Sequence, residues 1–317
     1  MSLNRPAKLD VQGFEAALAD LEKGLCVAIP TETVYGLAAD STNGKAVAQI
    51  FAIKERPSFN PLICHVDGIE MAGKYGELSP LALRLAEAFW PGPLTIVVPL
   101  KTGAQIADLV TAGLGSIGLR HPKGISSDLI SRFGKPLAAP SANRSGRVSP
   151  TTADHVAEEF PDIDLTILDQ GACDVGLEST IIKVEHEILT LLRPGAVTSE
   201  MIEDVTGLKP EQPVGRKVEA PGMMESHYAP NAGVRLNVTH CDTSDAWLQF
   251  GANAPAHAQA LNLSKTGDLI EAAANLYGML KQLDKSGVER ICVSPIPETG
   301  IGIAVNDRLR RAAAPRQ

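Results

Sequence analysis

Hydrophobic and polar positions along the chain alternate between a helical period and short apolar runs. Residues 10–23 carry apolar side chains at helical spacing and Gly24 follows them, so the pattern predicts a helix. The apolar run 25–29 is typical of a buried strand. Further helices are expected at 44–53, 79–90 and 151–160, and further strands at 62–66, 95–98, 116–119, 165–168, 180–184 and 189–192. This mixture predicts an α/β domain, and its irregular strand and helix spacing argues against a purely parallel sheet.

A proline-rich segment, residues 208–232, divides the chain. Its prolines and glycines interrupt the periodic pattern, and a loop longer than ~15 residues is usually functional or disordered. Beyond it the pattern resumes, with strands expected at 234–238 and 290–293 and helices at 267–286 and 300–313. We therefore expect a large domain at 1–207, a linker at 208–232 and a small α/β domain at 233–317.

Composition narrows the class of protein. Hydrophobic residues make up 44% and charged residues 21% of the 317 residues, which is typical of a globular protein. No apolar run approaches the ~20 residues that span a bilayer, and the polar N-terminus lacks the apolar core of a signal peptide. We therefore expect a cytoplasmic protein without membrane contact. The five cysteines form no CxxC pair, so they indicate neither a zinc site nor a disulfide framework.

The net charge of −8 opposes a broadly basic nucleic-acid binder. An anionic ligand would have to be held by a local cluster of bases. One such cluster is KERPSFNPL (54–62), which brings Lys54, Arg56 and Asn60 onto a loop stiffened by two prolines. Both cations suit phosphate groups.

Other polar segments lie at the ends of expected strands, where α/β folds bind ligands. PTETVYGL (30–37) follows the strand at 25–29, and Arg120 follows 116–119, where a guanidinium suits a carboxylate. His65 lies inside an apolar strand, where a histidine is more often structural than ligand-binding.

The segment 138–151 holds small residues, hydroxyls, an amide and two arginines. Ser149 and Pro150 suit a helix start, and helix N-termini bind anions. Capping explains these two residues but leaves Ser141 to Arg147 unexplained, which favours a binding function for the segment.

Taken together and in order, these segments resemble the threonylcarbamoyl-AMP synthase family in its long two-domain form. The matching pieces are PTETVYGL (30–37), KERPSFNPL (54–62), GLRHP (118–122), PSANRSGRVSPT (140–151), EST (178–180), LRPG (192–195) and HYAP (227–230). The ending NDRLRRAA (306–313) is similar too.

The resemblance implies a YrdC-like catalytic domain built on a twisted, mixed open sheet, followed by a small Rossmann-like α/β domain. It implies an adenylyl transfer that makes threonylcarbamoyl-AMP and pyrophosphate from L-threonine, bicarbonate or CO2, and ATP. The product would serve the N6-threonylcarbamoyladenosine modification of tRNAs that read codons beginning with A, through a downstream tRNA threonylcarbamoyl-transferase complex. Mg2+ is the expected cofactor, held mostly by ATP and water because no dedicated carboxylate cage is apparent.

The resemblance also implies roles for single residues. Lys54 and Arg56 would be the catalytic cations, since no general base or nucleophile is apparent and charge stabilisation would carry the rate. The threonine pocket would comprise Thr33, His65, Arg120, Ala139 and Ser179. The ATP contacts would comprise Arg56, Asn60, Ser116, Ser141, Ser149, Arg193 and Tyr228.

Three alternatives stay open at this stage. A non-enzymatic protein that binds double-stranded RNA or the ribosome could use the same basic concavity, although the charge of −8 limits RNA binding to weak affinity. A carbamoyl-transfer maturation enzyme shares the implied fold but carries zinc-finger modules, which the missing CxxC pairs disfavour. The third is a plain ATP-binding regulatory domain.

Overall fold

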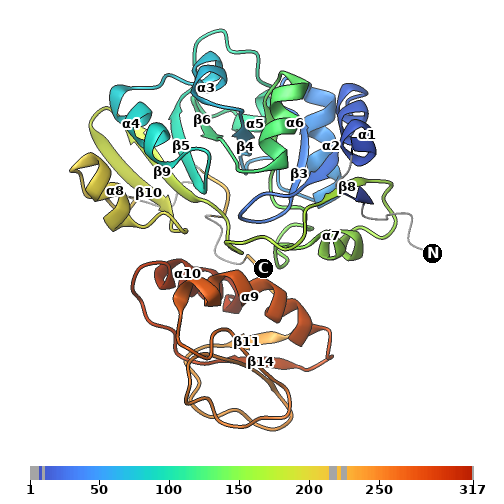
Figure 1. Ribbon diagram of the computed structural model, residues 1–317, viewed down its shortest axis with the longest axis vertical. Helices are drawn as coiled ribbons and strands as arrows, with labels where there is room; N and C mark the ends of the chain where they lie inside the picture. The colour runs from blue at the N-terminus through green and yellow to red at the C-terminus, as the bar shows by residue number, and fades with distance from the viewer. Residues whose placement is uncertain (1–6, 9–10, 214–219, 223–226, 316–317) are drawn as a thin grey trace.

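Two β-sheets form the framework of the protein (Figure 1). The computed structural model describes residues 7–8, 11–213, 220–222 and 227–315. The large sheet has ten strands in the order β1 (Ala7–Lys8), β8 (Thr166–Asp169), β2 (Val27–Ile29), β3 (Gly36–Asp40), β7 (Leu137–Ala138), β4 (Ile63–His65), β6 (Ser116–Arg120), β5 (Leu94–Pro99), β9 (Thr180–Glu185) and β10 (Ile188–Arg193). The small sheet has four strands in the order β11 (Gly233–Arg235), β14 (Arg290–Val293), β12 (Ala246–Gln249) and β13 (Ala260–Asn262).

The large sheet is mixed, whereas every strand pair of the small sheet is parallel. In the large sheet β4 pairs with β6, and β5 with β9, in parallel, while β2–β3, β3–β7, β4–β7, β5–β6 and β9–β10 are antiparallel. The expected mixed sheet with a second, smaller α/β unit is therefore confirmed.

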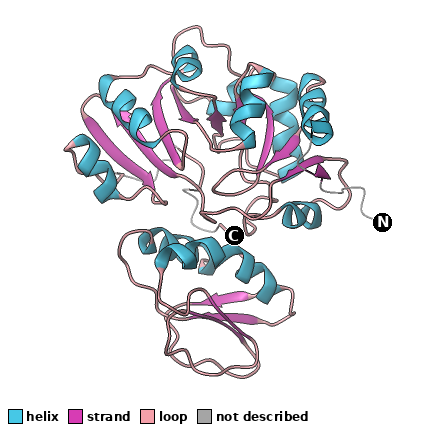
Figure 2. Ribbon diagram, in the orientation of Figure 1, coloured by secondary structure: helices cyan, strands magenta, loops and turns pink. Residues whose placement is uncertain are grey.

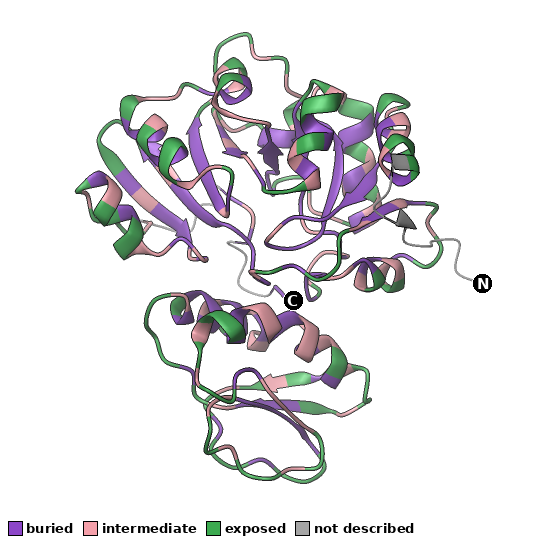
Figure 3. Cartoon of the chain, in the orientation of Figure 1, coloured by how far each residue is buried: buried purple, intermediate pink, exposed green. Residues whose placement is uncertain are grey.

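Helices cover the sheets and complete two separate hydrophobic cores. Figure 2 shows that the two long helices of the C-terminal unit lie between the small sheet and the rest of the chain. Figure 3 shows the strands of the large sheet mostly buried, with exposed positions on β9 and on the edge strand β10. The helices are α1 (Val11–Glu22), α2 (Gly44–Lys54), α3 (Ile69–Tyr75), α4 (Pro80–Phe89), α5 (Asp108–Thr111), α6 (Ile125–Phe133), α7 (Ala153–Glu159), α8 (Ser199–Thr206), α9 (Leu269–Asp284) and α10 (Gly302–Ala313).

Local sequence explains where α2 begins and ends, and this places the first cationic loop. The Asn43 side chain accepts hydrogen bonds from the backbone N–H groups of Lys45 and Ala46, as a helix N-cap does. The helix stops at Lys54 because Glu55 takes a left-handed conformation with φ of 53°. The chain then turns toward β4, so that Arg56 lies near the edge where the strands end.

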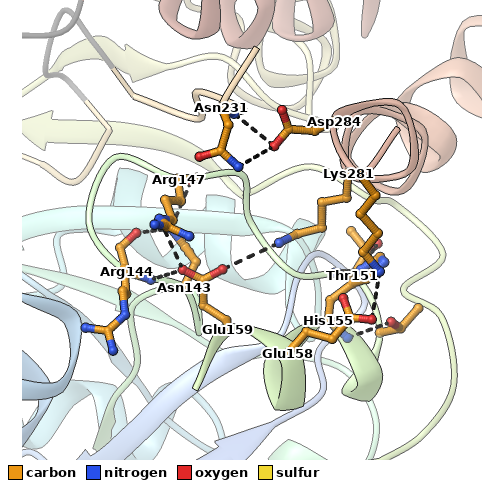
Figure 4. Close-up of polar contacts among 12 residues, drawn as sticks. Asn143, Arg144, Arg147, Thr151, His155, Glu158, Glu159, Asn231, Lys281 and Asp284 are labelled. Atoms are coloured by element: carbon orange, nitrogen blue, oxygen red, sulfur yellow. Dashed lines mark hydrogen bonds and ion pairs between the residues drawn. The ribbon is translucent and has the colours of Figure 1, made fainter. Parts of the chain in front are cut away.

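The C-terminal unit packs closely against the large one. Gly176 has φ of +72°, and a Cβ atom there would lie 2.5 Å from Cα of Ala274 on α9, so only glycine allows this approach. Lys285, which follows α9, binds Glu158 of α7 at 2.7 Å across the two units. The carboxylate of Asp284 on α9 accepts hydrogen bonds from the backbone and the side chain of Asn231 (Figure 4).

Most expected elements are present with boundaries within a few residues, and the expected strand at 234–238 is shorter, as β11. The pattern gave no expectation for β1, β3, α3, α5, α6, β7, α8, β12 and β13. The domain limits at 207/208 and 232/233 stay predictions. All five cysteines are free and buried. No helix among the described residues has the length and apolar character that a bilayer crossing needs.

Candidate functional site

A cavity of about 50 Å³ lies where strands of the large sheet meet the linker. Its wall combines cations, hydroxyls and one carboxylate with a few apolar groups. The lining residues are Thr33, Val34, Arg56, Ile63, His65, Arg120, Ala139, Pro140, Ser141, Glu178, Ser179, Arg193, Pro221, Gly222, His227 and Tyr228.

The predicted threonine residues Thr33, His65, Arg120, Ala139 and Ser179 all lie in this wall, as do four predicted ATP contacts, Arg56, Ser141, Arg193 and Tyr228. Strand register explains part of this convergence. His65 and Arg120 are direct partners in the parallel pair of β4 and β6, and β7 adjoins β4 on the other side and leads into Ala139. The structure thus gathers residues that are far apart in the sequence, and their assignment to threonine or ATP stays a prediction.

Four predicted residues lie outside this wall. Lys54 is buried, and its ammonium donates hydrogen bonds to the backbone carbonyls of Ser141, at 2.6 Å, and Asn143. Lys54 therefore fixes the backbone of the loop that carries Ser141, and it does so without lining the cavity. Asn60 is buried in the loop after Arg56. Ser116 lines two neighbouring hollows on the sheet, one of them about 320 Å³.

The fourth, Ser149, is buried and donates to the Glu178 carboxylate at 2.5 Å. Glu178 is also bound by the C-terminal unit, at 2.8 Å by Arg308 of α10 and at 2.9 Å by Tyr277 of α9. Burial would raise the pKa of Glu178, but the charges of Arg308 and Arg193 outweigh it and lower the pKa to about 2. Glu178 is therefore ionised at neutral pH, and its charge is compensated from the second unit.

Arg308 reaches this position through a fully buried side chain. Its guanidinium also donates to the Pro194 carbonyl at 2.9 Å and to Asp307 at 2.6 Å, and it lies 5.3 Å from the centre of the Tyr228 ring. Sequence reasoning missed this contribution of Arg308. The ending at 306–313 was noted as similar to the long form, but the pattern could not indicate that it reaches the cavity wall.

Arg56 is fixed by its own loop. Its guanidinium donates to the carbonyls of Asn60, at 3.2 Å, and Pro61, at 2.8 Å. Burial is the main cause that lowers the pKa of Arg56, to about 10, and Arg193 lowers it further while Tyr228 opposes the shift. Arg56 therefore stays positively charged at neutral pH, in an environment where an anionic partner would be favourable.

Arg120 contacts Glu32, which follows β2 in the segment 30–37. The two side chains form an ion pair of 2.8 Å, and both are buried, with 4% and 7% of their surface exposed. Nearby, the hydroxyls of Thr31 and Thr33 lie 2.8 Å apart, and Thr31 donates to the Val34 carbonyl at 2.7 Å. These contacts orient Thr33 at the cavity. Sequence reasoning did not anticipate that Glu32 would pair with Arg120.

The linker contributes His227 and Tyr228. Tyr228 has φ of 64°, an uncommon backbone conformation for a non-glycine residue, and its ring stacks on Tyr277 at 5.7 Å. Burial lowers the pKa of His227 to about 3, and Glu178 opposes that shift. Burial likewise lowers the pKa of His65 to about 3, and the charge of Arg120 adds to it. Both imidazoles are therefore neutral at physiological pH.

Within the described residues, the ionisable groups close enough to hold a metal ion are Cys241, Asp245 and Cys292, all in the C-terminal unit. The cavity wall itself offers one carboxylate, Glu178, which already has charged and neutral donors around it. The cavity thus carries Arg56, Arg120 and Arg193 and suits anions.

Comparison with known proteins gives the same family over almost the whole chain. A family model described as "Telomere recombination" matches residues 19–195, and one described as "Threonylcarbamoyl-AMP synthase, C-terminal domain" matches residues 197–314. Threonylcarbamoyl-AMP synthase of Bacillus subtilis is 36% identical, over 95% of this chain and 92% of its own length. The protein of that name from Pyrococcus abyssi is also 36% identical, over 99% of this chain and 98% of its own.

Solved structures agree. The crystal structure of P. abyssi Sua5 complexed with L-threonine matches with a TM-score of 0.88 and 34% identity, over 97% of this chain and 96% of that one.

Proposed function

This chain belongs to the threonylcarbamoyl-AMP synthase family, and on that premise we propose that it makes threonylcarbamoyl-AMP and pyrophosphate from L-threonine, bicarbonate or CO2, and ATP. One observation carries the proposal: the buried Arg120 and Arg193 and the partly buried Arg56 share a single cavity with serine and threonine hydroxyls. The L-threonine complex of the P. abyssi relative supports threonine as the amino acid.

The charge of the cavity suits the chemistry. The threonine amine would attack CO2 to give a carbamate, and a carbamate oxygen would attack the α-phosphorus of ATP and expel pyrophosphate. Two like charges 4 Å apart repel by ~4 kcal/mol at an effective dielectric constant near 20. Because a carboxylate, a carbamate and a triphosphate must approach one another, cations fixed in advance lower the barrier.

Each cation has a fitting role. Arg120 would hold the threonine carboxylate, exchanging or sharing its contact with Glu32, while Arg56 and Arg193 would hold the phosphates. Ser141 and Tyr228 would add donors to the nucleotide, and Lys54 would act by supporting the Ser141 loop. Neutral His65 and Thr33 would line the amino-acid side. Rate enhancement would come from positioning and charge stabilisation.

Mg2+ is part of the proposal as a companion of ATP. The one carboxylate of the wall is held by Arg308, Tyr277 and Ser149, so it makes a poor direct metal ligand. An ion bound to the phosphates and water fits this donor set better, and it would supply charge neutralisation of the triphosphate. A downstream tRNA-modifying transferase would receive the product.

The test is pyrophosphate release by the purified protein with ATP and Mg2+, with threonine and bicarbonate omitted in turn. We expect release that requires both, with serine replacing threonine at a cost of about 10- to 200-fold in kcat/KM, since one methyl contributes ~1–3 kcal/mol. Release that ignores threonine, or no release from a folded protein, would contradict the proposal and favour an RNA-binding or plain nucleotide-binding protein.

A further inference from the structure

Thr95 is a buried residue of β5 that belongs to none of the predicted binding segments. Its hydroxyl oxygen lies 2.7 Å from the hydroxyl oxygen of Ser179, in the cavity wall. Thr95 is completely buried, and its main-chain partner across the parallel pair with β9 is Ile181. Its methyl group faces β6 on the other side, where a Cβ atom added to Gly118 would lie 3.4 Å from Cγ2 of Thr95. The branched side chain thus turns its hydroxyl toward β9 and Ser179.

Counting protons around Ser179 shows which way these hydrogen bonds run. A serine hydroxyl can donate one hydrogen bond and accept two. Arg193 has only donors, so its Nη2 donates to Ser179 Oγ at 3.1 Å. Among the described residues, Ser179 Oγ is the partner of the Thr95 hydroxyl. Either hydroxyl could donate across this contact. Ser179 lines the cavity, where a bound substrate can accept its proton, whereas Thr95 lies outside that wall. A buried hydroxyl without an acceptor costs about 1–3 kcal/mol, so with substrate bound only donation from Thr95 to Ser179 satisfies both hydroxyls.

Ser179 then accepts two hydrogen bonds, from Arg193 and Thr95, and keeps its own proton to donate. In the part of the chain that the structure describes, its hydroxyl bonds to these two residues, and its side chain lines the cavity. The positive charge of Arg193 also polarises the serine O–H bond, which makes the Ser179 hydroxyl a stronger hydrogen-bond donor.

We propose that Thr95 is a positioning residue that, with Arg193, fixes Ser179 as a hydrogen-bond donor to a negatively charged carboxylate-type oxygen of the amino-acid substrate. That oxygen belongs either to the amino-acid carboxylate or to its carbamate. This inference rests on the proposed function, because it assumes that the cavity binds the amino acid. Thr95 itself lies outside the binding motifs.

The first test replaces the hydroxyl with a methyl group of nearly the same shape, as Thr95→Val. Losing a fixed donor to a charged oxygen costs about ten-fold in kcat/KM for threonine, whereas the KM for ATP should stay within about two-fold. Thr95→Ser restores the hydroxyl and should restore most of the kcat/KM for threonine. A rise in the KM for ATP as large as the loss in kcat/KM for threonine, or no loss for threonine, would overturn the proposal.

A matched control separates positioning from stability. Thr206 on α8 also has a buried hydroxyl, bonded at 2.7 Å to the Ile202 carbonyl, but it lies outside the cavity wall. Thr206→Val should lower the melting temperature without changing the kcat/KM for threonine. Should Thr95→Val fail to fold, Thr95→Ala removes the same hydroxyl without the branched side chain and is measured in its place.

A double-mutant cycle tests whether Thr95 acts through Ser179. In a Ser179→Ala background, Thr95→Val should cause no further loss. Additive losses would mean that Thr95 acts elsewhere and would refute the proposal.

Calorimetric titration of threonine without bicarbonate or ATP distinguishes the two oxygens. Weaker threonine binding by Thr95→Val identifies the carboxylate, and unchanged binding with slower turnover identifies the carbamate. No change in either overturns the inference. The wild-type requirement for threonine and bicarbonate is measured alongside, so that a failure of the proposed function is recognised separately.

Discussion

Arg56 combines a fixed geometry with a retained charge. Its guanidinium is held by two carbonyls of its own loop, and its pKa of about 10 keeps it protonated at neutral pH. Because the Arg56 side chain is already held in place, it loses little conformational entropy when it binds a phosphate.

Arg56→Ala should therefore raise the KM for ATP or lower kcat by about 10- to 100-fold, since hydrogen bonds to charged groups contribute about 1.5–3 kcal/mol. Steady-state pyrophosphate release at varied ATP measures this. Arg132→Ala, at an exposed position on α6, is the control and should behave like the wild type. A near-normal ATP response from Arg56→Ala would remove Arg56 from the nucleotide site.

The buried pair of Arg120 and Glu32 makes a second residue-scale prediction. Removing one partner of a buried ion pair leaves an uncompensated charge, which costs about 3–5 kcal/mol. Arg120→Ala should thus lower the free energy of unfolding as well as raise the threonine requirement. Adding Glu32→Gln should recover most of the stability but not the threonine affinity. If the double variant bound threonine normally, the proposed carboxylate contact of Arg120 would be wrong.

At the scale of elements, the linker forms one side of the cavity. It contributes Pro221, Gly222, His227 and Tyr228 to the wall. Gly222 has φ of +81°, and a Cβ atom there would lie 2.6 Å from the Tyr228 hydroxyl and 3.2 Å from Nη1 of Arg193. Glycine therefore permits the linker to approach two residues proposed for ATP.

Gly222→Ala should lower kcat/KM for ATP by about ten-fold, because roughly 1 kcal/mol of left-handed backbone strain adds to the clash. Gly207→Ala is a matched control: Gly207 has φ of +74°, but a Cβ atom there would meet nothing within 4 Å. That control should lose stability alone. Equal activity of the two variants would show that the linker contact is dispensable.

The elements also show how far sequence reasoning extends. Long periodic segments such as α1 and α9 were predicted because one face of each packs into a core. The strand β3 (GLAAD) was missed because it is buried throughout and small side chains give it no alternation. Nine of the thirteen predicted site residues line the cavity, because the ends of several strands converge there. Lys54 and Arg308 could not be assigned their contacts, because long-range packing alone decides whether a buried cation faces a ligand or a carbonyl.

At the scale of the whole molecule, buried histidines link stability to pH. The pKa of the partly buried His155 on α7 is lowered to about 4, mainly by burial and then by Lys281 of the second unit (Figure 4). The pKa values of the buried His65 and His227 are lowered to about 3. An unfolded histidine titrates near 6.5. Below that pH the unfolded chain binds more protons than the folded one, so stability falls as pH decreases from about 6.5 toward 4.

Denaturant unfolding at pH 7, 6 and 5 should show this decline before carboxylates such as Glu178 titrate. His155→Gln keeps an acceptor for the Thr151 backbone N–H and should reduce the slope. A flat profile between pH 7 and 5 would contradict the buried, neutral state of these side chains.

The guanidinium of Arg308 gives the C-terminal unit a consequence beyond its own fold. A chain shortened to the large unit would not simply lose residues. It would keep the Glu178 carboxylate in the cavity wall but lose the Arg308 guanidinium and the Tyr277 hydroxyl that bind it. An uncompensated negative charge would then lie beside the anionic substrates. Cutting this protein between its units would therefore change the electrostatics of the cavity wall, although the cut lies outside that wall.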